Sequence, residues 1–173
     1  MNQVPEVLIS HRVYRDGVDM LGIADVELPD LEPLTEKIKG AGIAGEVETP
    51  VLGHYGSMTL KLSWRTLVAS VAYLAQQKTH HLEIRGASQV YNAGSGEYEV
   101  VPIKVVVRGN PKKTGLGKFD VGAKTDSSSE LEVVYLKVII NNIDVIEIDK
   151  YNYICKVNGE NVLSAVSEAL GLI

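Results

Sequence analysis

"SMTLKLSW", residues 57–64, alternates polar and apolar side chains at every position. Successive side chains of an extended strand point to opposite faces, so this pattern predicts a strand with one face in the core. The apolar face consists of Met58, Leu60, Leu62 and Trp64. The face directed away from the core consists of Thr59, Lys61 and Ser63.

Further strands are expected before and after this segment. Asp16-Gly17 is a dipeptide typical of tight hairpin turns, and Asn141-Asn142 suits a tight turn because asparagine tolerates positive φ. Abundant valine and isoleucine also favour strands, since β-branched side chains fit a pleated surface. The expected strand regions are residues 6–28, 79–88, 96–109 and 130–159.

The second strand of the first hairpin has an apolar face and a mixed, acidic face. The apolar face consists of Val18, Met20, Ala24, Val26 and Leu28. The mixed face consists of Asp19, Leu21, Ile23, Asp25 and Glu27.

Two helices are expected among the strands. Over about residues 65–77, Leu67, Val71 and Leu74 recur at helical spacing. A short amphipathic helix ends the chain, with Gly171 as its stop signal. The sequence therefore predicts a mainly β fold, an antiparallel β-sandwich or barrel of about eight strands with these two helices. We expect one domain over residues 1–173.

Two long polar segments interrupt the strand pattern, at about residues 30–55 and about residues 109–129. The first is rich in proline, glycine and charge. Long irregular loops are uncommon in compact domains and are usually functional. We therefore predict an assembly loop at 30–55 and a second polar loop at 109–129.

Composition excludes several classes of protein. The chain has a single cysteine, so an internal disulfide or a cysteine-rich zinc site is excluded. The net charge of −5 argues against a protein that grips nucleic acid, because phosphate affinity needs clustered lysine and arginine. No signal peptide and no apolar stretch of membrane-spanning length is apparent.

Residues 40–45, GAGIAG, match the G-x-G-x-x-G dinucleotide fingerprint. That fingerprint requires a buried strand before it and a helix after it. Here a charged segment precedes it, and Pro50 and Gly53 follow it. Elsewhere His80 and His81 are adjacent, so they point to opposite faces of a strand and cannot chelate one metal together. We expect no catalytic residues, cofactor or metal. A small nucleotide- or ligand-binding β-domain that uses glycines 40–45 remains the alternative.

Several segments, in their order and spacing, resemble the major tail tube protein family of contractile-tailed bacteriophages. The same family supplies the inner tubes of R-type bacteriocins and other contractile injection systems. The resemblance covers essentially the full chain. Its carriers are IKGAGIAGEV (38–47), SMTLKLSW (57–64), IKVVVRG (103–109), VIEIDKYNYICKVNG (145–159) and the short C-terminal helix.

The resemblance implies a structural subunit and no enzyme. Six copies would form a ring in which strands make one continuous inner β-barrel, and rings would stack into a hollow tube. A sheath protein outside would drive the tube through a bacterial envelope, with a baseplate or tube initiator and a tail terminator at its ends. DNA or ions would pass the lumen without specific binding, and the monomer would not insert into a membrane. Assembly in the bacterial cytoplasm would yield a virion or an extracellular phage-tail-like particle.

The resemblance also implies roles for two sets of residues. The loop at 30–55 would lie along a neighbouring subunit, where glycine permits close backbone approach and unusual φ angles. Its candidate inter-subunit residues are Ile38, Gly40, Gly42, Ile43, Gly45 and Val47. The strand faces directed away from the core would line the lumen. The lumen candidates are Asp19, Asp25, Glu27, Thr59, Lys61 and Ser63.

Overall fold

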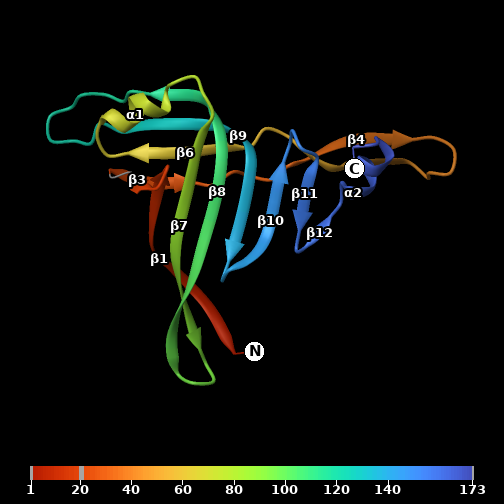
Figure 1. Ribbon diagram of the computed structural model, residues 1–173, viewed down its shortest axis with the longest axis horizontal. Helices are drawn as coiled ribbons and strands as arrows, with labels where there is room; N and C mark the ends of the chain where they lie inside the picture. The colour runs from red at the N-terminus through yellow and green to blue at the C-terminus, as the bar shows by residue number, and fades with distance from the viewer. Residues whose placement is uncertain (1, 20–21, 173) are drawn as a thin grey trace.

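A computed structural model describes residues 2–19 and 22–172. Within this part the chain forms twelve strands and two short helices, which confirms the mainly antiparallel β fold with more strands than the eight expected. Figure 1 shows their arrangement. The elements are β1 (Gln3–Arg15), β2 (Val18–Asp19), β3 (Ile23–Glu27), β4 (Pro33–Lys39), β5 (Glu46–Tyr55), β6 (Thr59–Trp64), α1 (Ala69–Leu74), β7 (His80–Asn92), β8 (Glu97–Gly115), β9 (Ser127–Ile140), β10 (Ile143–Asp149), β11 (Ile154–Val157), β12 (Glu160–Asn161) and α2 (Ser164–Ala169).

Ten of these strands belong to one antiparallel sheet that folds over itself. Its main path runs β12-β11-β10-β9-β8-β7-β1-β2. Strand β9 is shared: its first half, residues 127–132, pairs with β6, and its second half, residues 135–140, pairs with β10. Strand β3 extends the sheet beyond β6. Figure 1 shows β3 and β6 running across β7 and β8, so the sheet forms two layers that enclose the core.

The core lies between these layers and is built around β6. The four apolar side chains predicted from the alternation of residues 57–64 are buried, which confirms that face assignment. Each fully buried side chain of this size contributes about 1.5–3 kcal/mol relative to an exposed one. The surrounding core consists of Val13, Val71, Leu74, Leu82, Ile84, Val105, Val107, Leu131, Val133, Leu136, Ile148, Cys155 and Leu163.

The helices are shorter than expected. Helix α1 covers only residues 69–74 of the predicted 65–77, and Leu67 is exposed, whereas Val71 and Leu74 are buried. The helix has no side-chain N-cap and no acidic residue in its first turn. A helix this short depends on packing, so it ends where the contact with the core ends. At the C-terminus, Gly171 follows α2 with a φ of 70°, as a helix stop requires.

The predicted strand over residues 18–28 is two strands with different partners. Strand β2 pairs with β1 across the Asp16-Gly17 turn, whereas β3 pairs with β6. A β-bulge between Ile23 and Asp25 resets the alternation, so Ile23 packs against the core together with Val26. The mixed-face assignment of Ile23 is therefore wrong. Met20 and Leu21 lie outside the described residues.

The first predicted loop is largely strand, and the second is shorter than predicted. Within residues 30–55, β4 and β5 pair as a separate two-stranded antiparallel sheet, closed by a turn at 40–45. Strand β8 continues to Gly115, so the second loop spans 116–126 and not 109–129. Alternation is hard to recognise in both segments because lysine, glutamate and proline occupy strand positions. The Asn141-Asn142 turn is confirmed, with φ angles of 50° and 62°.

Candidate assembly surfaces

We call residues 33–55, which comprise β4, β5 and their turn, the assembly hairpin. Its two strands place Ile38 opposite Val47 and Glu36 opposite Thr49 on one face. Leu34 and Val51 are the next apolar residues along the two strands, at the register shift between Pro33 and Thr35. All four apolar side chains are exposed; Val47, for example, is 52% exposed. The hairpin therefore presents an apolar face to solvent.

The opposite face of the assembly hairpin is polar and internally paired. Lys37 Nζ lies 3.2 Å from Glu46 Oε1, and Thr35 Oγ1 donates a hydrogen bond to Glu48 Oε1 at 2.5 Å. These contacts are at the surface and stabilise the hairpin only slightly. An isolated two-stranded hairpin is marginally stable in water. Covering its apolar face would stabilise it much more.

The three glycines of the fingerprint shape the turn of this hairpin. Gly40, Gly42 and Gly45 have φ angles of 135°, 87° and 109°, which L-residues rarely adopt. The Ile43 amide closes the turn on the Gly40 carbonyl at 3.1 Å. A strand follows the turn, so there is no helix N-terminus at which a pyrophosphate could bind. The glycines serve hairpin geometry, and the nucleotide alternative lacks its binding element.

The hairpin joins the main body through a short neck. The Gly56 amide donates a hydrogen bond to the Glu32 carbonyl at 2.9 Å, and Lys150 Nζ donates one to the Gly56 carbonyl at 2.7 Å. A Cβ at Gly53 would lie 2.5 Å from the Leu163 side chain. The end of β5 near the main body therefore packs closely on the residue before α2. Figure 1 shows the hairpin projecting beyond the main sheet at one end of the long axis.

Five of the six lumen candidates share one surface of the main sheet. The register pairs Asp25 with Ser63 and Glu27 with Lys61, on the face opposite the core. Asp19 lies elsewhere, on β2 beside Tyr14, and its carboxylate pairs with Arg12. Two carboxylates of β9 that were not among the lumen candidates lie beside the candidates on β6. These are Glu130, opposite Lys61, and Glu132, opposite Thr59.

This surface is acidic overall, because Asp30 and Glu32 line it beside Glu27, Lys61 and Glu130, and its carboxylates outnumber its lysines. Lys112 Nζ lies 3.6 Å from Glu132 Oε2 and 3.1 Å from Thr59 Oγ1, and Lys113 pairs with Glu130 in the register. The alternation of ELEV at 130–133 would have placed both glutamates on the outer face of β9. Their partner strand could not be read from the sequence.

A second exposed apolar region extends beyond the core, and we call it the N-terminal blade. It comprises residues 3–9 of β1, 86–92 of β7 and 97–103 of β8. Within the described residues, β1 pairs with β7 along its length but with β2 only at Tyr14 and Arg15, so one edge of β1 is open. Open apolar edges mark sites of association or aggregation. The exposed apolar side chains are Val4, Val7, Leu8, Ile9, Tyr98 and Val100.

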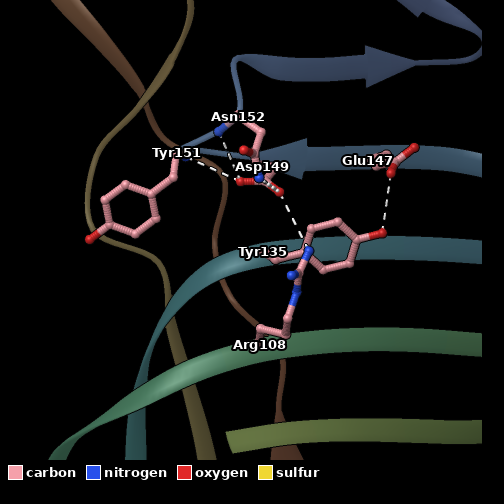
Figure 2. Close-up of polar contacts among 6 residues, drawn as sticks. All are labelled: Arg108, Tyr135, Glu147, Asp149, Tyr151 and Asn152. Carbon is pink, nitrogen blue, oxygen red and sulfur yellow. Dashed lines mark hydrogen bonds and ion pairs between the residues drawn. The ribbon is translucent and has the colours of Figure 1, made fainter. Parts of the chain in front are cut away.

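A buried carboxylate organises the turn between β10 and β11. Asp149 accepts hydrogen bonds from the backbone amides of Tyr151 and Asn152 at 3.1 and 3.2 Å, and from Asn152 Nδ2 at 2.7 Å. Arg108 Nη2 lies 3.4 Å from Asp149 Oδ2. The guanidinium of Arg108 also stacks over the Tyr135 ring. Figure 2 shows these contacts converging on Asp149, with Tyr151 directed away from them. The turn therefore holds an exposed tyrosine in place.

The Tyr135 hydroxyl completes this network by donating to Glu147 Oε1 at 3.1 Å. Burial raises the pKa of Tyr135, and the neighbouring Glu147 carboxylate raises this pKa further. The hydroxyl therefore remains a hydrogen-bond donor at neutral and moderately alkaline pH.

Replacing Asp149 with alanine is expected to lower the free energy of unfolding by about 2–3 kcal/mol, because it leaves two amides and a guanidinium without their acceptor. Asp149→Asn retains one acceptor oxygen and is expected to cost about half as much. Urea denaturation of both variants measures the difference. A loss below about 0.5 kcal/mol for Asp149→Ala would show that the turn does not depend on the carboxylate.

Residues 2–19 and 22–172 contain no group of three histidine, cysteine or acidic side chains that could hold a metal ion. In the same part of the chain, no helix is long and apolar enough to cross a membrane. His80 is buried and bonds the Gln76 carbonyl at 2.9 Å, whereas His81 is exposed on the other face.

The antiparallel β-body exposes an apolar hairpin and an open strand edge, which is typical of a structural protein that makes contacts with other chains. The sequence pattern of the phage tail tube protein FII family matches residues 5–171, so the chain belongs to that family and is a structural tail tube subunit. It is 27% identical to the tail tube protein of Escherichia phage P2, over 98% of this chain and 99% of that protein. It is 24% identical to the major tail tube protein of Serratia phage KSP20, over 98% of each chain.

A solved structure is also similar. It is the sheath/tube terminator of an extracellular contractile injection system, with a TM-score of 0.48 and 15% identity, covering 79% of this chain and 96% of that one. The family resemblance inferred from the sequence is confirmed by the family match and the two phage relatives.

Proposed function

We propose that six copies of this chain form a ring and that rings stack into the hollow inner tube of a contractile tail. The observation that carries this proposal is the assembly hairpin, whose apolar face is exposed on a two-stranded sheet that is marginal alone. The neighbouring copy covers that face. The inter-subunit residues are the six named from the sequence, with Ile38 and Val47 as apolar anchors and the glycines shaping the turn.

Ring closure uses the open edge of β1. Strands of adjacent copies pair there, so that the sheets form one continuous inner β-barrel and the unpaired amides and carbonyls gain partners. The exposed apolar side chains of the N-terminal blade support this arrangement, since ring formation would bury them. A sheath protein surrounds the tube, and an initiator and a terminator bind its ends. The particle is a virion or a phage-tail-like particle assembled in the bacterial cytoplasm.

The proposal is tested by sedimentation of the purified protein at increasing concentration, followed by negative-stain microscopy. We expect concentration-dependent assembly into rings and tubes, with a lag if growth must be nucleated. A strictly monomeric protein at high concentration would contradict the proposal. Melting temperatures that rise on adding nucleotides would instead support a ligand-binding domain.

The five lumen candidates on β3 and β6 line the lumen, which repels or ignores DNA, and Asp19 on β2 adds a carboxylate apart from them. The excess of carboxylates over lysines on the β3–β6–β9 surface supports this role. A basic lining would retain DNA by counterion release, with affinity falling steeply as salt rises, at a slope of about 0.9 per phosphate contact. A conduit must not retain its cargo.

Reversing Asp19, Asp25 and Glu27 to lysine is therefore expected to make assembled tubes retain DNA at low salt and release it as salt rises. Retention is measured by co-sedimentation of DNA with tubes. Replacing the same residues with their amides removes charge without adding cations, and this control should not cause retention. Tight DNA binding by unmodified tubes at physiological salt would refute the lumen assignment.

A further inference from the structure

The loop that connects β8 to β9, residues 116–126, exposes apolar side chains at its tip. Phe119 is 89% exposed, Val121 is fully exposed, and Leu116 lies exposed at the base of the loop. The tip, residues 118–124, also contains two lysines, Lys118 and Lys124, and one aspartate. An exposed phenylalanine beside a valine on a projecting loop is typical of an interaction site.

The neck of this loop is held in a defined geometry. The Lys118 amide bonds the Thr125 carbonyl at 2.9 Å, and the Thr125 amide bonds the Arg65 carbonyl at 3.0 Å. At Gly117 the two sides of the neck approach so closely that a Cβ would lie 2.1 Å from the Thr125 carbonyl oxygen. These contacts fix the base of the loop, and within the tip the Ala123 amide donates a hydrogen bond to the Asp120 carbonyl at 3.1 Å. A loop that is partly ordered before binding loses less conformational entropy on binding.

The loop and the assembly hairpin lie at opposite ends of the long axis, as Figure 1 shows. The loop of one copy is therefore out of reach of its own hairpin, but it can meet the hairpin of the next copy. A contact between two different ends of the same chain repeats from copy to copy, which is how rings and open polymers grow.

Charge favours the loop over the N-terminal blade as the partner of the hairpin. On the hairpin, Glu36 stands on the apolar face between Leu34 and Ile38. The blade contains Glu6, Glu97 and Glu99 and no lysine or arginine within residues 3–9 and 86–103. The loop carries Lys118 and Lys124 together with Asp120 and Asp126, so it is neutral overall, whereas the blade is acidic. Glu36 would meet only like charge on the blade but could pair with a lysine of the loop, and like charges disfavour an interface.

We propose that the loop 116–126 of one subunit docks on the apolar face of the assembly hairpin of another subunit, in a head-to-tail contact. Phe119 and Val121 cover Ile38 and Val47, while Lys118 and Lys124 flank Glu36. This inference rests on the proposed function, because it names the partner of the hairpin in the assembled tube.

Cysteine cross-linking tests the contact directly. A chain with both Val47→Cys and Val121→Cys is assembled into tubes, oxidised and then denatured without reductant. It should give a ladder of disulfide-linked oligomers on an electrophoresis gel. Each single variant, treated in the same way, should give only the single chain. The natural Cys155 is buried and does not interfere. The matched control pairs Val47→Cys with Val100→Cys on the N-terminal blade, and it should form no ladder.

Charge exchange gives an independent measurement. Lys118→Glu with Lys124→Glu should raise the protein concentration needed for half-maximal assembly by about tenfold, and adding Glu36→Lys should restore it to within about threefold. Tubes that form without a Val47–Val121 ladder overturn the inference but leave the proposed function intact. The loop contact is also wrong if the Val47–Val100 control forms a ladder and the Val47–Val121 pair does not. It is likewise wrong if the single variant Val121→Cys forms disulfide-linked dimers. If neither the unmodified chain nor any variant assembles, both the loop contact and the proposed tube function are wrong.

Discussion

Replacing Trp64 with alanine is expected to lower the free energy of unfolding by about 3–5 kcal/mol. Trp64 is 1% exposed at the end of β6, and its Nε1 donates a hydrogen bond to Ser129 Oγ at 3.1 Å. Alanine would leave a large cavity between the two layers of the sheet and would remove the donor to a buried hydroxyl. The free energy of unfolding of a domain is typically about 5–15 kcal/mol, so this single change would remove a large part of it.

Urea denaturation followed by far-UV circular dichroism measures this loss. Trp64→Phe keeps most of the ring volume and should cost less than the alanine variant. Leu52→Ala, at an exposed site of the assembly hairpin, should change the free energy of unfolding by less than about 0.5 kcal/mol. A Trp64→Ala variant as stable as the Leu52→Ala variant would show that β6 is not at the centre of the core.

Replacing Val47 with aspartate is expected to prevent tube assembly while leaving the monomer folded. Val47 lies on the exposed apolar face of the assembly hairpin, which contributes little to the core. An unpaired carboxylate buried against a neighbouring subunit costs several kcal/mol, and each 1.4 kcal/mol is tenfold in an equilibrium constant. We expect the protein concentration required for assembly to rise by about 100-fold or more.

Thermal melting and sedimentation on the same samples separate folding from assembly. Val47→Ile keeps an apolar, β-branched side chain at the same place and should assemble like the unmodified protein. If Val47→Asp melts much earlier, the hairpin is a folding element. If Val47→Asp assembles normally, the apolar face is not buried between subunits.

Much of the strand content could be predicted because alternation is a local property. The burial of Met58, Leu60, Leu62 and Trp64 followed from residues 57–64 alone. The Asp16-Gly17 and Asn141-Asn142 turns followed from residue types that accept positive φ. The assembly hairpin was missed as a strand pair because charged and apolar residues are interleaved along both of its strands.

The apolar tip at Phe119 was also missed, because the surrounding lysines, glycines and serines made the segment look uniformly polar. Glu130 and Glu132 were missed as neighbours of Lys61 for a different reason. Their orientation on β9 follows from the sequence, but their position beside β6 depends on which strands pair.

The sequence by itself determined which side chains of β6 face the core, since the two-residue period acts over a few neighbouring residues. It also determined the family, because the order and spacing of several segments extend over nearly the whole chain. Only the tertiary structure decided that β9 divides its length between β6 and β10, that β3 leaves β2 to pair with β6, and that β4 and β5 stand apart from the main sheet. Partner choice among strands depends on burial and hydrogen bonding between residues far apart in the chain, and no local pattern encodes it.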